Sequence, residues 1–246
     1  MRAGELAVVT GAARGIGFAV VEQLLGDGLR VLATDRNPEG LKMAAARGAE
    51  TIEADLASDG GRDLLVSRAG GAQYLVNAAG IIHLAPISEV TGADLRRVFA
   101  VNVEATWDLT SRLGERMAGG GAVVNLSSSS AKLAGTTEAA VYACSKAAIL
   151  SITRSFAYEF ARRGVRVNAV CPGIVDTPMQ EEVVEKVSAI RGMASEEFRE
   201  ARNRGVPLGR AASPGECARV IRFLLTDDAG YMTGQAINIT GGLVTW

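Results

Sequence analysis

The stretch Thr10-Gly11-Ala12-Ala13-Arg14-Gly15-Ile16-Gly17 decides the fold, because it joins a strand-like segment to a helical one. The run Leu6–Thr10 is short and apolar, and Gly15–Leu25 carries apolar residues at helical spacing. A glycine-rich turn at this place lets the backbone approach a diphosphate, and the free N–H groups of the following helix point at it. The spacing is G-x-x-x-G-x-G and not the common G-x-G-x-x-G, so the alternative is a glycine-rich turn that binds nothing.

The same alternation of strands and helices continues along the chain. Further strands are expected at Arg30–Thr34, Glu50–Ala54, Gln73–Ala78, Ala122–Ser128, Arg166–Cys171 and Ala236–Thr240. Helices are expected at Pro38–Arg47, Gly61–Ala69, Thr91–Met117, Val141–Arg163 and Pro214–Leu225. The pattern predicts an α/β fold with one doubly wound parallel sheet and a single domain over residues 1–246. The charged segment 177–209 contains no strand and is expected to form a helical lid over the carboxyl edge of the sheet.

Composition and charge exclude several classes of protein. The chain has 246 residues and a net charge of −1 without a basic block, which argues against a nucleic-acid partner. No apolar run reaches the roughly 18–20 residues of a membrane span, and a strand begins too early for a signal peptide. Three cysteines and one histidine at no ligand-like spacing predict no metal site, and the cysteines suit a reducing compartment. We therefore expect a cytoplasmic protein.

Asp35 follows the second predicted strand and lies 18 residues after Gly17. An acid at about this distance can accept hydrogen bonds from both hydroxyls of an adenosine ribose, and it repels a 2′-phosphate. Asp35 therefore favours NAD over NADP, although Arg14 and Arg36 could each pair with a phosphate. The alternative is that Asp35 serves only as a turn residue before Asn37-Pro38.

Tyr142 and Lys146 stand four residues apart in Tyr142-Ala-Cys-Ser-Lys146 and so share one face of a predicted helix. A tyrosine can act as an acid or base near neutral pH only if its pKa falls from about 10. A fixed ammonium group nearby favours the phenolate. This pair alone is a weak signal, since any helix can carry it by chance.

Taken together, these motifs and their spacing resemble the short-chain dehydrogenase/reductase family. The resemblance covers essentially the whole chain, and it rests on the Thr10–Gly17 loop, Asn77-Ala78-Ala79-Gly80, Asn102, the serine run 127–130, the Tyr142/Lys146 pair and Pro172-Gly173. It implies a Rossmann-type fold and an oxidoreductase that moves a hydride between NAD and the carbinol or carbonyl carbon of a small polar alcohol or ketone. It also implies a homotetramer with the two long predicted helices paired between subunits.

The resemblance also assigns roles to individual residues. Tyr142 is the expected general acid/base, Lys146 lowers its pKa and holds the nicotinamide ribose, and Asn102 supports a water chain to Lys146. The remaining residues expected to contact the cofactor are Gly11, Arg14, Gly15, Ile16 and Gly17 at the phosphates, Asp35 at the ribose, Asp55, Leu56, Asn77, Ala78 and Gly80 around the adenine, and Pro172, Gly173, Val175 and Thr177 at the carboxamide.

The serine that binds the substrate oxygen has two candidates, since relatives commonly place it 13 residues before the tyrosine. That spacing selects Ser129, whereas counting along the predicted strand selects Ser128. Strand geometry fixes side-chain direction more firmly than a loop does, so we favour Ser128 and keep Ser129 as the alternative.

Other polar residues could contact substrate. His83 is either a substrate contact or a residue at the pocket rim, and Met179-Gln180 opens the lid segment. Arg191, Arg204 and Arg210 could clamp a carboxylate, but a solvated helix face is the favoured interpretation. The substrate groups suggested by the resemblance are hydroxy acids and sugar acids, acetoin and polyols, and cyclic dihydrodiols. Relatives that bind hydroxy acids carry an arginine shortly before the tyrosine, and Glu138-Ala139-Ala140 lacks one.

Two functions of other classes remain compatible with this sequence. One is a non-catalytic NAD-binding regulator; such proteins tend to lose part of the Ser, Tyr, Lys and Asn set, of which every member is available here. The other is a lyase or epimerase that uses the same tyrosine and lysine and retains NAD.

Overall fold

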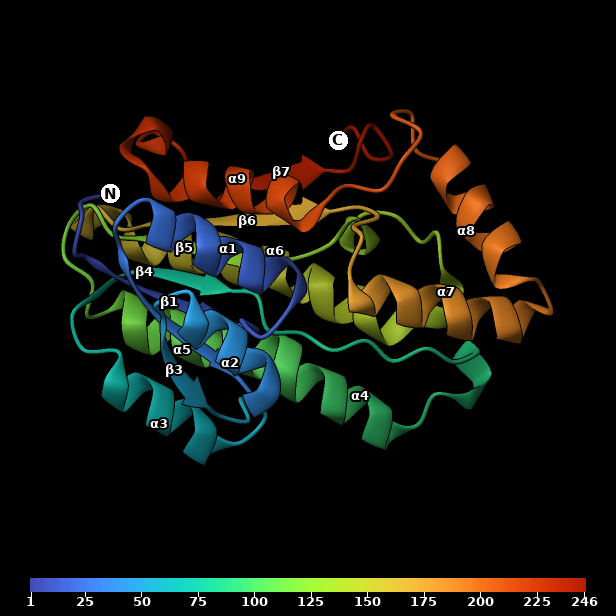
Figure 1. The fold of residues 1–246 in the computed structure, drawn as a ribbon, viewed down its shortest axis with the longest axis horizontal. Coiled ribbons are helices and arrows are strands. Elements are labelled where there is room, and N and C mark those ends of the chain that lie inside the picture. Colours follow the sequence, from blue (N-terminus) through green and yellow to red (C-terminus); the bar gives the residue numbers. More distant parts are fainter.

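A computed structural model describes residues Met1–Trp246 and shows one seven-stranded parallel sheet with the order β3-β2-β1-β4-β5-β6-β7 (Figure 1). Neighbouring strands are parallel in every pair, for example Val8 of β1 beside Leu32 of β2. The predicted doubly wound, Rossmann-type fold is confirmed. The strands are β1 (Leu6–Thr10), β2 (Arg30–Asp35), β3 (Glu50–Glu53), β4 (Ala72–Asn77), β5 (Ala122–Leu126), β6 (Arg166–Pro172) and β7 (Ala236–Ile239).

Helices cover both faces of the sheet and bury a separate core on each. One core joins the sheet to α1, α2 and α9, and the other joins it to α3, α5 and α6. Both faces of the central strands are therefore apolar, which explains why their sequences are continuous apolar runs. The helices are α1 (Gly15–Gly26), α2 (Pro38–Ala46), α3 (Asp59–Arg68), α4 (Gly92–Phe99), α5 (Ala105–Gly114), α6 (Ala140–Phe160), α7 (Pro178–Arg191), α8 (Ser195–Arg204) and α9 (Pro214–Leu225).

Two predicted elements differ from the structure. The helix expected at Thr91–Met117 consists of α4 and α5 joined by a π-helical segment, η2 (Ala100–Glu104), and it ends at Gly114. A π-helical turn adds a residue to the repeat and is not visible as a change in apolar spacing. The strand expected at Ala122–Ser128 ends at Leu126, because the chain then turns into the short 3₁₀ helix η3 (Ser129–Ala131).

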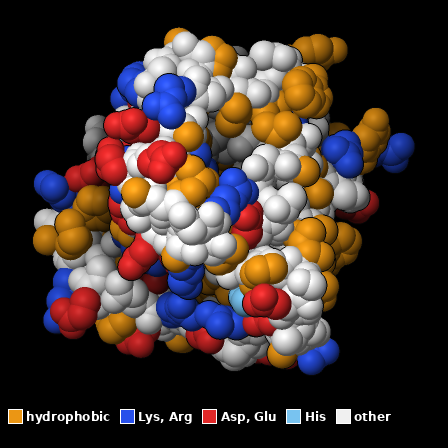
Figure 2. Space-filling model, turned by 90° about the vertical axis from the view of Figure 1, so that its right-hand side faces the viewer, with side chains coloured by type: hydrophobic (Ala, Val, Ile, Leu, Met, Phe, Trp, Pro, Cys, Tyr) orange, Lys and Arg blue, Asp and Glu red, His pale blue; other side chains and the backbone are white.

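The segment 177–209 forms the expected helical excursion. Helices α7 and α8 lie beyond the carboxyl ends of the strands, on the right of Figure 1, and pack on each other through a small apolar core of Val183, Val184, Val187 and Phe198. Seen from this end, acidic and basic side chains are interspersed with apolar ones, so this face has no single sign of charge (Figure 2). None of the helices in the structure has the length and apolarity needed to span a membrane.

Candidate active site

The ends of β1 and β4 approach each other closely at the point where the strand order reverses. The Thr10 hydroxyl accepts hydrogen bonds from the backbone N–H groups of Ala78 and Ala79, both at 3.0 Å. A β-carbon on Gly11 would lie 2.7 Å from the Ala79 nitrogen, and one on Gly17 would overlap the Gly11 carbonyl oxygen. Glycine is therefore required at both positions, and the crevice at this switch point is where open α/β sheets bind ligands.

The N-terminus of α1 opens toward this crevice without a capping side chain. Arg14 occupies the N-cap position and its side chain makes no capping hydrogen bond, whereas Thr177 and Ser213 cap α7 and α9 with their hydroxyls. Unpaired N–H groups and the positive end of the helix dipole favour an anion at this place. The loop therefore fits the diphosphate of a dinucleotide by its own geometry.

A cavity of about 430 Å³ runs from this loop to the lid. Met179 and Gln180, at the start of the lid, lie in its wall as well. All but two of the residues predicted to contact cofactor or substrate line it, namely Gly11, Arg14, Gly15, Ile16, Gly17, Asp35, Asp55, Leu56, Ala78, Gly80, Ser128, Tyr142, Lys146, Pro172, Gly173, Val175 and Thr177.

The first exception is Asn77, which the sequence places among the adenine-pocket residues. Its side chain is buried and faces away from the cavity, where its Nδ2 donates to Thr110 Oγ1 at 3.0 Å and to Asn125 Oδ1 at 2.9 Å. The Asn77 side chain does not line the cavity, for a geometric reason, and the expected part of this residue in shaping the adenine-side pocket stays a prediction. Successive strand residues point to opposite faces of the sheet, and Asn77, the last residue of β4, points toward α5.

The second exception is Asn102, which lies in the π-helical segment and is fully buried. Its Oδ1 accepts from the Ile81 N–H at 2.9 Å, and its Nδ2 donates to the Ile81 carbonyl at 3.0 Å and to Ser145 Oγ at 2.9 Å. Ser145 in turn donates to the Tyr142 carbonyl at 2.7 Å. Asn102 thus ties the chain after β4 to the helix that carries Tyr142. Its role in a water chain to Lys146 stays a prediction.

Ser128 and Tyr142 face each other across the cavity. Ser128 has extended backbone angles just beyond the end of β5, and its hydroxyl lies close enough to the Tyr142 phenol to act toward a lower pKa of that group. The Ser128 hydroxyl also accepts from the Ser130 N–H at 3.1 Å. Ser129 lines the same cavity from the first position of η3. The contact with the phenol favours Ser128 as the serine that shares a substrate oxygen with Tyr142.

Lys146 is buried one helical turn after Tyr142. Its Nζ donates to the Leu126 carbonyl at 2.7 Å and lies 5.5 Å from the centroid of the Tyr142 ring. Burial lowers the pKa of Lys146 to about 8, so the ammonium can release its proton near neutral pH.

The pKa of Tyr142 does not fall as the sequence predicts. Burial raises it to about 12, and the Ser128 hydroxyl acts in the opposite direction. Burial penalises the phenolate more than the neighbouring Ser128 hydroxyl favours it. A positive nicotinamide ring would supply the further charge that the phenolate needs, because opposite charges at short range stabilise the ionised form.

Asp35 lies at the end of β2 and holds the rim of the cavity. Its two carboxylate oxygens accept from the Ala13 N–H at 3.2 Å and from the Asn37 N–H at 3.0 Å. These bonds from backbone N–H groups agree with the interpretation of Asp35 as a turn residue. The residue also lines the cavity, as do Arg14 and Arg36. The observed position of Asp35 is therefore compatible with a turn residue and with an acid that binds the ribose.

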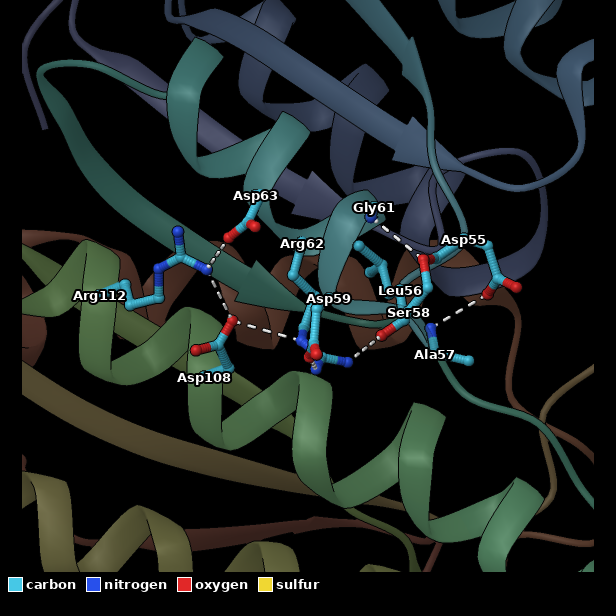
Figure 3. A network of polar contacts seen from close by, with 10 residues as sticks. All are labelled: Asp55, Leu56, Ala57, Ser58, Asp59, Gly61, Arg62, Asp63, Asp108 and Arg112. Atoms are coloured by element: carbon cyan, nitrogen blue, oxygen red, sulfur yellow. Dashed lines mark hydrogen bonds and ion pairs between the residues drawn. The ribbon is translucent and has the colours of Figure 1, made fainter.

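A network of ion pairs supports the Asp55-Leu56 turn at the far end of the cavity (Figure 3). Arg62 on α3 is buried and donates to the Leu56 carbonyl at 2.8 Å, and it pairs with Asp59 and with Asp108 of α5. Arg112 on α5 bridges Asp108 and Asp63. The network joins α3 to α5 and fixes the turn against the sheet. Nothing in the sequence distinguishes Arg62 from a solvated helical arginine.

The arginines considered as carboxylate clamps are engaged elsewhere. Arg191 on α7 forms a two-pronged ion pair with the buried Glu138, at 2.7 and 2.8 Å, and so ties the lid to the segment before α6. Arg210 pairs with Glu216 of α9, and Arg204 with Glu200 on the surface. Arg191 is exposed on its helix, as the favoured interpretation expects, and it also pairs with Glu138 because the lid folds back onto that residue. His83 does not line the cavity, and its Nδ1 lies 3.6 Å from Asp94.

Comparison with known proteins agrees with this geometry. Residues 11–244 match the family described as Enoyl-(Acyl carrier protein) reductase. The chain is 37% identical to the short-chain type dehydrogenase/reductase y4vI of Sinorhizobium fredii, over 97% of this chain and 43% of that protein. It is 35% identical to the D-threitol dehydrogenase of Mycolicibacterium smegmatis, over 97% of this chain and 92% of that protein.

Among solved structures, a variant of actinorhodin polyketide ketoreductase with NADPH superimposes with a TM-score of 0.91 and 34% identity, covering 99% of this chain and 98% of that one. The chain belongs to the short-chain dehydrogenase/reductase family, whose members are oxidoreductases that use a nicotinamide cofactor.

If Arg62 positions the adenine end of the cavity, its loss should weaken cofactor binding without changing the chemical step. We expect Arg62→Met to raise the dissociation constant of NAD about tenfold, since a buried charged hydrogen bond is removed, with little change in kcat. Arg68→Met is the matched control, because Arg68 is exposed on the same helix. Calorimetric titration measures the constant. An unchanged constant in a folded Arg62→Met protein would show that the network serves stability alone.

Proposed function

We propose that this protein is an NAD-dependent dehydrogenase that oxidises a small polar alcohol to the carbonyl compound and catalyses the reverse reduction. The observation that carries this proposal is the convergence of Ser128, Tyr142 and Lys146 on one cavity, with the Lys146 Nζ atom 5.5 Å from the centroid of the Tyr142 ring. These three groups line the same cavity as the glycine loop and Asp35. A substrate hydroxyl and a dinucleotide can therefore meet in one site.

In the proposed reaction, Ser128 and Tyr142 bind the substrate hydroxyl and orient its carbon. When bound, NAD would supply a ring able to accept the hydride of this carbon. Tyr142 removes the hydroxyl proton as phenolate, and Lys146 then passes a proton toward solvent, which a lysine with a pKa of about 8 can do near neutral pH. Asn102 keeps Ile81 and Ser145 in place beside these groups.

The preference for NAD over NADP rests on Asp35. Its carboxylate is held at the cavity rim by two backbone N–H groups, so it can accept the ribose hydroxyls without rearrangement. A fixed negative charge at this place would repel a 2′-phosphate. Arg14 and Arg36 line the same cavity and would attract one, so the preference depends on which charge lies nearer the ribose.

We also propose a homotetramer and a cytoplasmic location. Tyr158 on α6 is 87% exposed and Trp107 on α5 is 51% exposed, so the two long helices present large aromatic side chains to solvent. Such groups are typical of subunit interfaces. The three cysteines are free, which suits a reducing compartment. Light scattering should give a mass of four chains, and a monomer mass would contradict the assembly.

The experiment that tests the activity follows NADH absorbance with a panel of hydroxy acids, polyols, acetoin and cyclic diols, with NAD and NADP in parallel. We expect turnover of one group with NAD. Tyr142→Phe should bind NAD as the wild type does and lose nearly all turnover, because it lacks the group that takes the proton. Wild-type kcat in Tyr142→Phe would contradict the assignment of the base. Bound NAD with no oxidation of any alcohol would favour the regulatory or lyase functions.

A further inference from the structure

Arg202 on α8 is a cation in the wall of the active-site cavity with most of its hydrogen-bonding capacity unused. Its Nε and Nη1 atoms are buried from solvent and have no hydrogen-bond partner. Its Nη2 reaches only the Gln180 Oε1, at a long 3.4 Å. A guanidinium carries five N–H donors, and a buried cation without an anion is costly. A group that lies in the cavity during function would relieve that cost.

No acidic side chain pairs with Arg202, and this separates it from the other lid arginines. Arg191 pairs with Glu138, Arg199 with Glu181, and Arg204 with Glu200. Arg202 instead lies over the Phe198 ring, 5.5 Å from its centroid. Burial, with a smaller contribution from the positive charge of Arg191, lowers the pKa of Arg202. The protein itself therefore leaves this cation without a partner, although ion pairs surround it on the same helices.

Arg202 lines the same cavity as Ser128 and Tyr142. The Phe198 ring also lies 5.5 Å from the guanidinium of Arg191. Arg191 forms an ion pair with Glu138, which stands four residues before Tyr142. Phe198 thus connects Arg202 to the segment that leads into the helix carrying Tyr142. Gln180 lies beside it in the cavity wall and keeps its amide nitrogen as a further donor.

We propose that Arg202 binds a carboxylate of the substrate, so that the alcohol oxidised at Tyr142 is a small hydroxy acid and the product an oxo acid. This inference rests on the proposed dehydrogenase function. The planar guanidinium matches a carboxylate with two parallel hydrogen bonds, and the surrounding low polarity strengthens them. The sequence lacks an arginine just before Tyr142, and Arg202 supplies the positive charge from the lid instead. Closure of the lid and recognition of the acid then depend on the same helix.

Two other anions could occupy this place. The diphosphate of the cofactor is one, because Thr177 at the start of α7 lies against Gly15 of the phosphate loop. The uncapped N-terminus of α1 already serves that group, and this favours the substrate for Arg202. A phosphate ester of a small alcohol is the other. Both are distinguished from a carboxylate by the experiment.

The test uses pairs of compounds that differ only in the acidic group, with saturating NAD. Suitable pairs are 3-hydroxybutyrate with 1,3-butanediol, lactate with 1,2-propanediol, and glycerate with glycerol, and glycerol 3-phosphate is added as the phosphate ester. We expect the wild type to prefer one acid over its diol by about 100-fold in kcat/KM. Arg202→Met should lower kcat/KM for that acid about 100-fold, mainly through KM, and leave the diol unchanged.

Two variants serve as controls. Arg204→Met removes an exposed lid arginine that pairs only with Glu200, and it should behave as the wild type. Arg202→Lys keeps the positive charge but lacks the planar guanidinium that can form two parallel hydrogen bonds. It should recover part of the preference for the acid. Thermal melting of each variant confirms that it is folded.

Each other outcome overturns the proposal. A higher KM for NAD with an unchanged KM for the acid would assign Arg202 to the diphosphate. A preference for glycerol 3-phosphate would assign it to a phosphate ester. Equal use of acids and diols by wild type and Arg202→Met would refute the carboxylate site while the dehydrogenase stands. If the wild type oxidises no alcohol, calorimetry can still test the site by measuring the binding of 3-hydroxybutyrate, lactate and glycerate to the NAD complex. The carboxylate site requires that one of these acids binds more tightly to the wild type than to Arg202→Met.

Discussion

The two hydrogen bonds that Ala78 and Ala79 donate to the Thr10 hydroxyl join the ends of β1 and β4, and the rest of the site depends on this contact. The two strands are neighbours in the sheet, but the chain leaves them in opposite directions, so a crevice opens above them. Gly11 and Gly17 allow the backbone to fill the space between the strands and α1 without side chains. A dinucleotide can then lie along the carboxyl edge of the sheet.

From this crevice, two further ties set the position of the catalytic groups. The π-helical turn directs Asn102 inward, where it holds Ile81 after β4 and Ser145 on α6. Lys146 donates to the Leu126 carbonyl at the end of β5. Helix α6 is thereby fixed to two adjacent strand ends, and Tyr142 is brought to Ser128. An active site needs reactive groups that are held by contacts on several sides, because a small displacement of such a group lowers the reaction rate strongly.

Electrostatics in the site follow from burial. The same desolvation lowers the pKa of Lys146 and of Arg202 and raises that of Tyr142. Both Tyr142 and Arg202 would be stabilised by a partner that the protein does not provide, a positive ring for the phenolate and an anion for the guanidinium. Glu138 and Arg191 show the contrast, since the buried carboxylate has the guanidinium as its partner and this pair holds the lid.

The sequence by itself determined the parallel α/β fold, the borders of most elements within a few residues, and most of the residues that line the cavity. It could do so because apolar periodicity, glycine turns and the Tyr142/Lys146 spacing are local properties of the chain. It did not show that the Asn77 side chain faces away from the cavity, because a side chain at a strand end faces one side of the sheet or the other. Only the tertiary structure decided the π-helical turn at Asn102, the burial of Arg62, the grip of Arg191 on Glu138 and the isolation of Arg202. These depend on contacts between segments far apart in the chain, and burial of a charged residue has no signature in its neighbours along the sequence.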